Sequence, residues 1–515
     1  MFLRVERTSD IRHGGQELMS FSARRSGISL RDVLKRFRAI GATDLKFSKA
    51  SKNAGESLDE TLYIAVMGND DDGHNRIDEA VANGCIAIVA ERFVTAPVPV
   101  FLVEDTRQAF QCIERELLGD PASQLHTVGI TGTYGKTACA NILHHVLSAD
   151  SNTVGLVSDL SVYDGHHVTD GWFRNSDDDS FSSPLDHMVR HSCTHAILEC
   201  HSAGLANQQY DSISLDAAII TRIRNAHTSL HGTLANYRRA KARILELLKP
   251  DGVVILNSDD PNTRFHLPRI DNPALTIGIH TDADITAHDL EHSYDGTSFT
   301  VDAGGHQATI SLPLLGTHHV YHALQAIALS LTTGMDLDSI VNRFSSLPRP
   351  AGHMHRVDSH SGFDIYVDVA NSADTLVMAM ESLRAITAGR LIVIFGPDGD
   401  TTPGERRHMG TVTERLSDVC ICTENNTMDI EFLDIAHDCM DGFEHPGRLS
   451  VIPSRIHAID WALSSAETGD TILIAGKGFN TLHHVGNVVQ EFDDISITQM
   501  LIREPSLFAT EDETR

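Results

Sequence analysis

Short apolar runs alternate with amphipathic stretches along most of the chain. The runs are rich in β-branched residues, and the stretches between them have the spacing of helices. Strands that are apolar on both faces and separated by helices are typical of parallel sheets covered on both sides. We therefore predict an α/β protein, with strands in TLYIAV (61–66), CIAIVA (85–90), THAILEC (194–200), DAAIIT (216–221), GVVIL (252–256), RLIVIF (390–395), VCICT (419–423) and TILIAG (471–476).

Turn clusters divide the chain into three blocks, residues 1–121, 122–348 and 349–515. The second boundary falls in LPRPAGHMH (347–355), where two prolines end a helical pattern. At 515 residues with 41% hydrophobic content, each block is large enough to bury a core of its own. We therefore predict three domains.

The charge and cysteine content narrow the classes of function. The 70 acidic residues outnumber the 41 basic ones, and a net charge of −29 repels nucleic acid and anionic membranes. The eight cysteines form no CxxC pair, which favours a reduced, cytoplasmic protein. No apolar stretch reaches the roughly 20 residues that a membrane helix needs, so we predict no membrane insertion.

A glycine-rich turn joins a strand to a helix in TVGITGTYGKTACANILHHVL (127–147). The helix is predicted to begin near Lys136 and to carry apolar residues, Ile142 and Val146 among them, on one face. In this setting backbone N–H groups surround phosphates, Lys136 adds a positive charge, and the Thr137 hydroxyl can reach Mg²⁺. The sequence therefore predicts a nucleotide site formed by Gly132, Thr133, Tyr134, Gly135, Lys136, Thr137 and Ala138.

This loop, with an extra glycine at position 132, is similar to the loop of the Mur ligases and of the related folylpolyglutamate synthetases. Further segments resemble Mur ligases in the same order, especially the members that add the third residue of the peptidoglycan stem peptide. They include LYIAVMGNDDDGHNRIDEAVANGCIAIVAER (62–92), LHGTLANYRRAKARIL (230–245), LNSDDPN (256–262), FGPDGD (395–400) and AGKG (475–478). The resemblance implies a UDP-sugar-binding first domain, a central P-loop ATPase domain built on a parallel sheet, and a Rossmann-like third domain.

The resemblance also implies a reaction and its site. ATP would activate the carboxylate of UDP-N-acetylmuramoyl-L-alanyl-D-glutamate as an acyl phosphate, and an amino acid would then attack it, with Mg²⁺ as the second cofactor. The implied catalytic residues are Lys136, His227 and Lys241, the last of them carbamylated in many family members. The implied Mg²⁺ ligands are Thr137, Glu199, His227 and Lys241; Asp368 would contact the nucleotide, and Ser182, Ser183, His201, Ser202 and Gly476 the other substrates.

Two of these residues are also indicated by their own positions along the chain. Glu199 ends a strand of the central sheet, where ligand crevices form in parallel sheets. Lys241 lies on a predicted helix that covers ANYRRAKARILELL (235–248), with Tyr237 and Leu245 four residues to either side. Its stem is therefore expected on the packing face of that helix.

The chain departs from the Mur ligase pattern at nucleotide and amino-acid positions. Arg222 replaces an asparagine that commonly contacts adenine, and GKGFN (476–480) replaces GKGHE, losing an acid. Members that use diaminopimelate carry DNPR, whose arginine grips the distal carboxylate, whereas the aligned TENNTM (423–428) has Met428 there. Because methionine cannot bind a carboxylate, we predict that diaminopimelate is not used in the usual way.

Two other functions stay open at this point. One is an amino-acid ligase of the folylpolyglutamate or cyanophycin synthetase type, which the first block argues against because those relatives lack a UDP-sugar domain. The other is a degenerate ligase that acts as a binding or scaffolding protein, which the intact loop argues against. A zinc site at Cys193, His195, Cys200 and His201 is disfavoured by strand alternation, and we expect a monomer.

Overall fold

The computed structural model describes residues 21–22, 28–37, 45–56, 58–67, 72–148, 152–171, 181–224, 231–265, 270–348, 354–359, 362–478, 480–485 and 488–503. Two compact units contain these residues. The first comprises the described residues within 287–320 and 341–515, and the second comprises those within 3–286 and 321–340. None of the helices in the described ranges combines the length and the apolar character that a membrane span requires.

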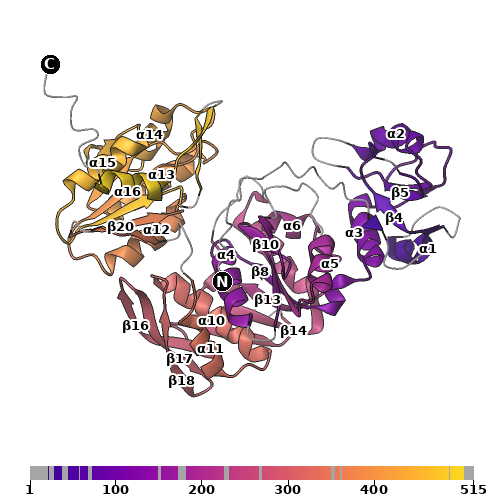
Figure 1. The fold of residues 1–515 in the computed structure, drawn as a ribbon, viewed down its shortest axis with the longest axis horizontal. Coiled ribbons are helices and arrows are strands. Elements are labelled where there is room, and N and C mark those ends of the chain that lie inside the picture. Colours follow the sequence, from indigo (N-terminus) through magenta and orange to yellow (C-terminus); the bar gives the residue numbers. More distant parts are fainter. Residues whose placement is uncertain are drawn as a thin grey trace. The chain divides into compact units, whose positions relative to one another are not determined.

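The early part of the second unit is a small, mainly parallel sheet (Figure 1). Strands β4 (Lys49–Ser51), β5 (Thr61–Ile64), β6 (Ala87–Ala90) and β7 (Val100–Leu102) run parallel, and β1 (Phe21–Ser22) pairs antiparallel with β4. Side chains alternate between two cores: Leu62 and Ile64 face the core with α3 (Thr106–Leu117), and Tyr63 faces the core with α2 (Ile77–Ala82). The sheet is therefore covered on both faces, as predicted for a parallel sheet.

The sheet that carries the phosphate loop is parallel at its centre. Strand β8 (His126–Thr131) lies between β12 (His195–Glu199) and β13 (Leu215–Ile220). Strand β9 (Val154–Val157) continues the sheet beyond β12, and β14 (Leu248–Asn257) and β15 (Ala274–Gly278) continue it beyond β13. Parallel pairing brings the carboxyl ends of these strands to one edge, which is where ligands bind in such sheets.

Several helices and a hairpin complete this part of the second unit. Helix α4 (Lys136–Leu147) begins at the residue predicted from the sequence, and its apolar face, including Ile142 and Val146, is buried. The hairpin of β10 (Ser161–Tyr163) and β11 (Val168–Asp170) follows β9. The remaining helices are α5 (Ser182–Arg190), α6 (Ser202–Ala206), α8 (Leu234–Ala242) and α9 (Pro261–Arg264).

One helix is shorter than predicted. The α-helix that carries Lys241 ends at Ala242, and residues Arg243–Leu247 form a 3₁₀-helix, so Leu245 lies outside α8. The tighter turn leads the chain directly into β14. Short 3₁₀ segments are common at helix ends, and apolar spacing does not distinguish them from α-helix.

Elements between the parallel sheet and the C-terminal sheet are β16 (Ile285–Ser293), the antiparallel pair β17 (Gly296–Ala303) and β18 (His306–Leu312), and helices α10 (Thr317–Thr332) and α11 (Leu337–Phe344). The C-terminal sheet has the order β19-β20-β24-β21-β22-β23, with every pair parallel except β19–β20. Its strands are β19 (His355–Val357), β20 (Asp364–Asp368), β21 (Leu391–Phe395), β22 (Val419–Cys422), β23 (Leu449–Val451) and β24 (Thr471–Ala475).

Helices cover both faces of the C-terminal sheet, which makes it doubly wound. Leu391, Val393 and Phe395 pack with α12 (Ala373–Arg384), α13 (Pro403–Leu416) and α14 (Phe432–Met440). The alternate residues Ile392 and Ile394 pack with α15 (Arg455–Ser465) and α16 (Asp494–Arg503). The short hairpin of β25 (Leu482–Val485) and β26 (Val488–Glu491) follows β24. The predicted α/β class with parallel sheets is confirmed.

Candidate active site

The loop between β8 and α4 approaches its neighbours so closely that it requires glycine at two positions. Gly135 caps α4 with φ of 81°, in the left-handed region, and a Cβ there would overlap the ring of His322. A Cβ on Gly132 would overlap the side chain of Thr221. The backbone can therefore turn tightly and expose the N–H groups at the start of α4, which is the arrangement that binds phosphate.

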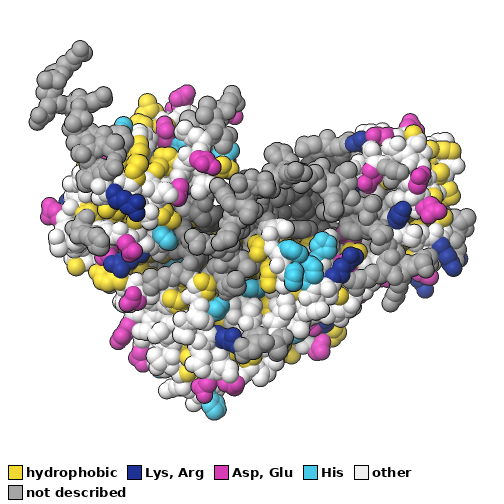
Figure 2. All heavy atoms as spheres, viewed as in Figure 1, with side chains coloured by type: hydrophobic (Ala, Val, Ile, Leu, Met, Phe, Trp, Pro, Cys, Tyr) yellow, Lys and Arg dark blue, Asp and Glu magenta, His cyan; other side chains and the backbone are white. Residues whose placement is uncertain are grey.

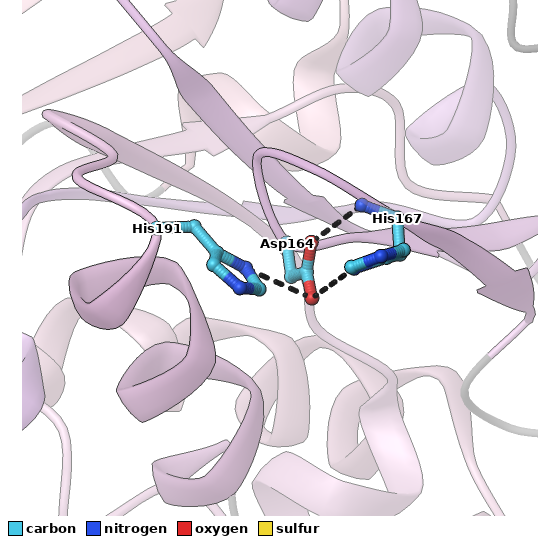
Figure 3. A group of neighbouring side chains, drawn as sticks. All are labelled: Asp164, His167 and His191. Atoms are coloured by element: carbon cyan, nitrogen blue, oxygen red, sulfur yellow. Dashed lines mark hydrogen bonds and ion pairs between the residues drawn. The ribbon is translucent and has the colours of Figure 1, made fainter.

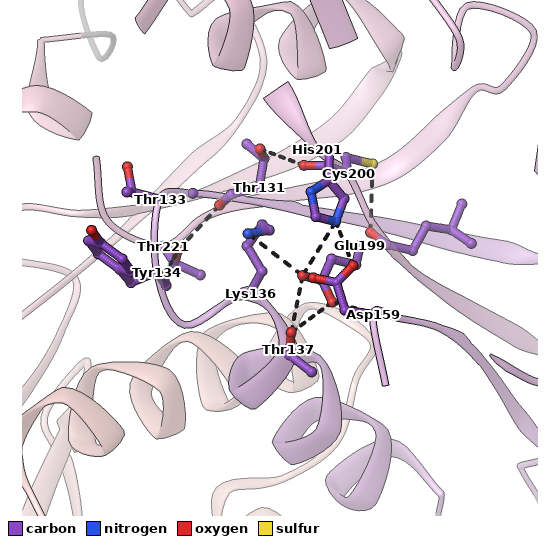
Figure 4. A network of polar contacts seen from close by, with 12 residues as sticks. Thr131, Thr133, Tyr134, Lys136, Thr137, Asp159, Glu199, Cys200, His201 and Thr221 are labelled. Atoms are coloured by element: carbon purple, nitrogen blue, oxygen red, sulfur yellow. Dashed lines mark hydrogen bonds and ion pairs between the residues drawn. The ribbon is translucent and has the colours of Figure 1, made fainter. Parts of the chain in front are cut away.

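The start of α4 and the end of β12 converge on one carboxylate (Figure 4). Thr137 Oγ1 lies 3.1 and 3.0 Å from the two carboxylate oxygens of Glu199, and Lys136 Nζ lies 3.7 Å from Glu199 Oε1. Glu199 is completely buried, although an acid at a strand end is usually solvated. The loop that would hold phosphate and a potential metal ligand are thus in direct contact.

Asp159, in the turn after β9, extends this group. Its backbone N–H donates to Glu199 Oε2 at 3.2 Å, and its Oδ1 lies 2.8 Å from His201 Nε2. His201 Nε2 also lies 3.9 Å from Glu199 Oε1. One ligand atom from each of Asp159, Glu199 and His201 therefore lies within 4.8 Å of the others, close enough to share one metal ion.

The two carboxyl groups have opposite pKa shifts. Burial raises the pKa of Glu199; the positive charge of Lys136 opposes this shift, and Asp159 adds to it. Burial also acts to raise the pKa of Asp159, but the hydrogen bond and charge of His201 and the charge of Lys136 lower it by more. Burying an acid with a raised pKa costs free energy that a bound cation would recover.

Lys241 lies beneath the phosphate loop rather than at the surface. Its Nζ donates to the backbone carbonyl of Gly132 at 2.6 Å and lies 4.7 Å from the centre of the Tyr237 ring. The side chain is 2% exposed, and burial, followed by the charge of Lys136, holds its pKa well below the usual value. Lys241 therefore packs against the site, as its helix position predicted, and is no surface lysine with a solvated head group.

Hydrogen bonds fix the other residues of the loop. Tyr237 donates to Thr133 Oγ1 at 3.1 Å, and Thr133 Oγ1 accepts from Arg224 N at 2.9 Å. Thr221 Oγ1 donates to the carbonyl of Tyr134 at 2.7 Å. Hydrogen bonds from α8 and from the segment after β13 thus hold the loop before any ligand binds, which reduces the cost of ordering it.

Most of the remaining predicted residues in the second unit lie at the beginnings of helices. Ser182 and Ser183 begin α5, and Ser202 begins α6, where its hydroxyl lies 3.1 Å from His231 Nε2. His227 lies outside the described residues. Ala138 lies in the first turn of α4.

Asp368 and Gly476 lie together in the C-terminal sheet. Asp368, at the end of β20, accepts from the backbone of Met354 at 2.6 Å and of Ala370 at 2.9 Å. Gly476, at the end of β24 with φ of 116°, donates its N–H to the carbonyl of Asp368 at 2.9 Å. Both residues therefore sit at the carboxyl edge of the first unit's sheet.

The stretch aligned with the amino-acid selector lies beside these residues. Lys477 is buried, and its Nζ donates to Leu482 O at 2.7 Å and lies 3.5 Å from Asn426 Oδ1. Burial, followed by the nearby Arg455, lowers the pKa of Lys477 to about 8. Met428 has a left-handed φ of 52° and is 38% exposed.

Asp159 is the residue of this site that sequence reasoning missed. A signal was present, since Asp159 closely follows the apolar run VGLV (154–157), as an acid at the carboxyl edge of a strand. Only the pairing of β9 with β12 brings it to Glu199, and these strands are separated by about 40 residues. Local pattern alone does not reveal that pairing.

The chain is similar in sequence to known Mur ligases. Family models match at residues 130–330, described as the Mur ligase middle domain, and at residues 352–478, described as the Mur ligase glutamate ligase domain. The chain is 30% identical over 451 residues to the UDP-N-acetylmuramoyl-L-alanyl-D-glutamate--2,6-diaminopimelate ligase of Geobacillus kaustophilus, covering 86% of this chain and 92% of the relative. The enzyme of the same name from Caldanaerobacter subterraneus subsp. tengcongensis is 30% identical over 478 residues, covering 92% of this chain and 98% of the relative.

Solved structures show the same fold. A structure of a UDP-N-acetylmuramoyl-L-alanyl-D-glutamate--2,6-diaminopimelate ligase superimposes with a TM-score of 0.69 at 23% identity, covering 93% of this chain and 99% of that one. MurF ligase from Thermotoga maritima, in complex with ADP, gives a TM-score of 0.61 at 19% identity, covering 89% of this chain and 97% of that one.

Proposed function

The chain belongs to the Mur ligase family, and from this premise we propose that it adds an amino acid to UDP-N-acetylmuramoyl-L-alanyl-D-glutamate with ATP as energy source. The observation that carries the proposal is the contact of Thr137 and Lys136 with the buried Glu199, which joins a phosphate loop to a metal-ligand group. In this reaction peptidoglycan precursors receive their third stem residue. The enzyme class is an ATP-dependent acid–amino-acid ligase.

The residues present suit Mg²⁺ and a nucleotide. Mg²⁺ prefers oxygen ligands, and Thr137, Glu199 and Asp159 offer three oxygen donors beside the loop. Glycine at positions 132 and 135 lets the loop pack closely against Thr221 and His322, so that the N–H groups at the start of α4 can face a phosphate. We propose that these residues hold Mg²⁺, with His227 and a carbamylated Lys241 as further ligands, and that Asp368 contacts the nucleotide.

ATP bound with Mg²⁺ would supply the phosphoryl group that activates the substrate carboxylate as an acyl phosphate. The chain's own contribution is positioning and charge: the N–H groups at the start of α4 and the Lys136 ammonium stabilise negative charge on the transferred group. Lys241 fixes the loop through its bond to the carbonyl of Gly132. Ser182, Ser183, His201 and Ser202 would bind the UDP-muramoyl-dipeptide, and Gly476 would contact the incoming amino acid.

We propose that residues 1–121 bind the UDP-sugar, 122–348 bind ATP, and 349–515 bind the amino acid and nucleotide. Relatives that match 92% of this chain must include part of the first block. This coverage supports a UDP-sugar substrate over a folate or cyanophycin substrate. We further propose that the protein is a monomer. We also propose that it is located in the cytoplasm, because the eight cysteines are all unpaired.

Calorimetric titration of Mg·ATP into the purified protein tests the site. We expect binding that Lys136→Ala weakens at least tenfold, while Lys249→Ala, which removes a lysine paired with Asp216 at 2.7 Å, leaves it unchanged. Equal binding by all three proteins would refute the assignment of the loop. Absence of binding in the wild type would favour the degenerate, scaffolding function.

The amino acid selected is a separate part of the proposal. Because Met428 stands where an arginine grips diaminopimelate, we propose that the substrate amino acid lacks a distal carboxylate. Met428→Arg is expected to raise kcat/KM for diaminopimelate at least tenfold relative to the wild type. Leu433→Arg, which adds the same charge at an exposed position of α14, is the control and should not. Efficient and preferential use of diaminopimelate by the wild type would contradict this part.

A further inference from the structure

A second group of potential metal ligands lies on the face of the molecule that Figure 2 shows, where His side chains gather over α5. Asp164 and His167 belong to the turn between β10 and β11, and His191 caps the C-terminal end of α5 (Figure 3). Asp164 Oδ2 lies 3.2 Å from His191 Nδ1 and 3.8 Å from His167 Nδ1. The three ligand atoms all lie within 4.8 Å of one another.

The carboxylate of this group is held in place by its own turn. Asp164 Oδ1 accepts from the backbone N–H groups of His166 and His167, at 2.9 and 2.8 Å, which leaves Oδ2 facing the two rings. Gly165 has a left-handed φ of 99°, and a Cβ there would overlap Cys193 Sγ. Cys193 in turn contacts the carbonyl of Asp164, with Sγ 3.3 Å from the oxygen. Ligands oriented by second contacts in this way are typical of metal sites.

We propose that Asp164, His167 and His191 form a binding site for Zn²⁺, separate from the Mg·ATP site and independent of the proposed ligase reaction. Two imidazoles and one carboxylate are the ligands that Zn²⁺ takes at about 2.0–2.2 Å. In a tetrahedral site such ligands are about 3.3 Å apart. The carboxylate lies 3.2 and 3.8 Å from the two ring nitrogens, and these nitrogens lie within 4.8 Å of each other, so the rings must move closer together to share one ion.

The residues around this group leave the fourth coordination position of a bound Zn²⁺ open to water. The side chain of His167 is 68% exposed, so the ion has a path from solvent and water can fill the fourth position. The ring of His166 lies 5.3 Å from that of His167 and 5.4 Å from that of His191, centre to centre. Because two of the three ligands in this group are imidazoles, it favours Zn²⁺ over Mg²⁺, whereas most of the ligands proposed for Mg²⁺ are oxygen atoms.

The zinc site ties together two segments that are distant in sequence. The β10–β11 turn follows the segment that carries Asp159, and α5 begins at Ser182. Bound Zn²⁺ would link this turn to the residue that caps the C-terminal end of α5 and would stabilise the folded state by mass action. The disfavoured site at Cys193, His195, Cys200 and His201 involves other residues, and Cys193 and His201 have different partners in the structure.

Competition with a coloured zinc chelator, applied to the metal-free full-length protein without nucleotide, tests the proposal. The probe is Zn²⁺ alone, followed by Co²⁺ as a reporter, because tetrahedral Co²⁺ has strong visible absorption and octahedral Co²⁺ does not. The variants are Asp164→Asn, His167→Ala and His191→Ala. The control is His288→Ala, which removes a surface imidazole 2.9 Å from the carboxylate of Asp289.

We expect one equivalent of Zn²⁺ to bind to the wild type and to His288→Ala, and each variant of the group to weaken it at least tenfold. His201→Ala, in the other ligand group, should leave this equivalent unchanged. Equal zinc affinity in all proteins, or loss only in His201→Ala, would overturn the proposal. Circular dichroism and thermal unfolding of the apo-proteins verify that the variants fold, and Asp164→Asn preserves the shape of the side chain if an alanine variant does not.

Discussion

Replacing Glu199 by glutamine should stabilise the metal-free protein and weaken its use of Mg·ATP. The wild-type carboxylate is completely buried beside Lys136 and Asp159. With an effective dielectric constant near 20, Lys136 at 3.7 Å attracts it by about 4.5 kcal/mol, and Asp159, within 4.8 Å, repels it by about 3.5 kcal/mol. These terms nearly cancel, and the cost of burying the charge remains.

The glutamine keeps the useful contacts of the wild type. Its carbonyl oxygen can accept from Thr137 Oγ1 and from the backbone N–H of Asp159, as Glu199 Oε2 does, and its amide can donate to the carboxylate of Asp159. We therefore expect the free energy of unfolding without metal to rise by about 1–2 kcal/mol at pH 7. Because the folded-state pKa of Glu199 is raised, its contribution to stability is full below about pH 4.5 and is lost as pH rises through the folded value. The difference in the free energy of unfolding between Glu199→Gln and the wild type should therefore grow as pH rises from about 4.5 through the folded-state pKa of Glu199.

Urea unfolding with and without Mg·ATP, together with turnover, measures both effects. At 100 times the dissociation constant, Mg·ATP stabilises the wild type by about 2.7 kcal/mol, and the variant should gain less than about 1 kcal/mol. Its turnover should fall about 10²–10³-fold. Glu414→Gln is the control: its carboxylate accepts from the backbone N–H groups of Glu444 and His445, so this change should destabilise the protein and leave the Mg²⁺ dependence unchanged.

A different pattern would refute the reasoning. If Glu199→Gln lost more than about 1 kcal/mol without metal and kept the Mg²⁺ dependence of the wild type, Glu199 would be a structural acid. The site would then need another metal ligand.

Three further predictions follow from single contacts. Gly135→Ala should abolish measurable ATP binding, because its Cβ would overlap the His322 ring. The control is Gly119→Ala, at φ of 75° with open space around it. It should lower the free energy of unfolding by only about 1–2 kcal/mol and leave ATP binding in calorimetry intact. If Lys241 is carbamylated, turnover of the wild type should rise with added bicarbonate. Turnover of Lys241→Met should be lower and should not depend on bicarbonate. If the turnover of Lys241→Met still rose with bicarbonate, carbamylation at this position would be excluded. The pKa of Lys477 is about 8 in the folded protein against 10.5 in the unfolded chain, and a depressed pKa gives stability that is lost as pH falls. Between pH 8 and pH 10.5 the free energy of unfolding of the wild type in urea should therefore rise by up to about 3 kcal/mol relative to that of Lys477→Met. Parallel pH curves for the two proteins would contradict this prediction.

Sequence reasoning predicted the parts of the site that depend on local pattern. The start of α4 at Lys136, the end of β12 at Glu199 and the packing face of Lys241 each follow from glycine placement, apolar runs or helical spacing. Asp159 and the zinc ligands could not be predicted in this way. They meet through strand pairing and through a helix end packed on a hairpin, and such long-range contacts leave no local periodicity.

The end of α8 was also beyond local reasoning. The apolar spacing of Ile244 and Leu247 continues the pattern of the helix, and both residues are buried. The chain nevertheless tightens into a 3₁₀ turn, because β14 must begin at Leu248 to pair with β13 at Leu215. Sheet registration thus overrides helix propensity at this point.

The most direct test of the ligase account is a coupled measurement on the purified protein. UDP-N-acetylmuramoyl-L-alanyl-D-glutamate, Mg·ATP and a mixture of the common amino acids are supplied, and phosphate and the extended peptide are quantified together, the peptide by mass spectrometry. We predict equal amounts of phosphate and extended product, formed only when all substrates are present and lost in Lys136→Ala. Phosphate release without extended product, or product that persists in Lys136→Ala, would contradict the account.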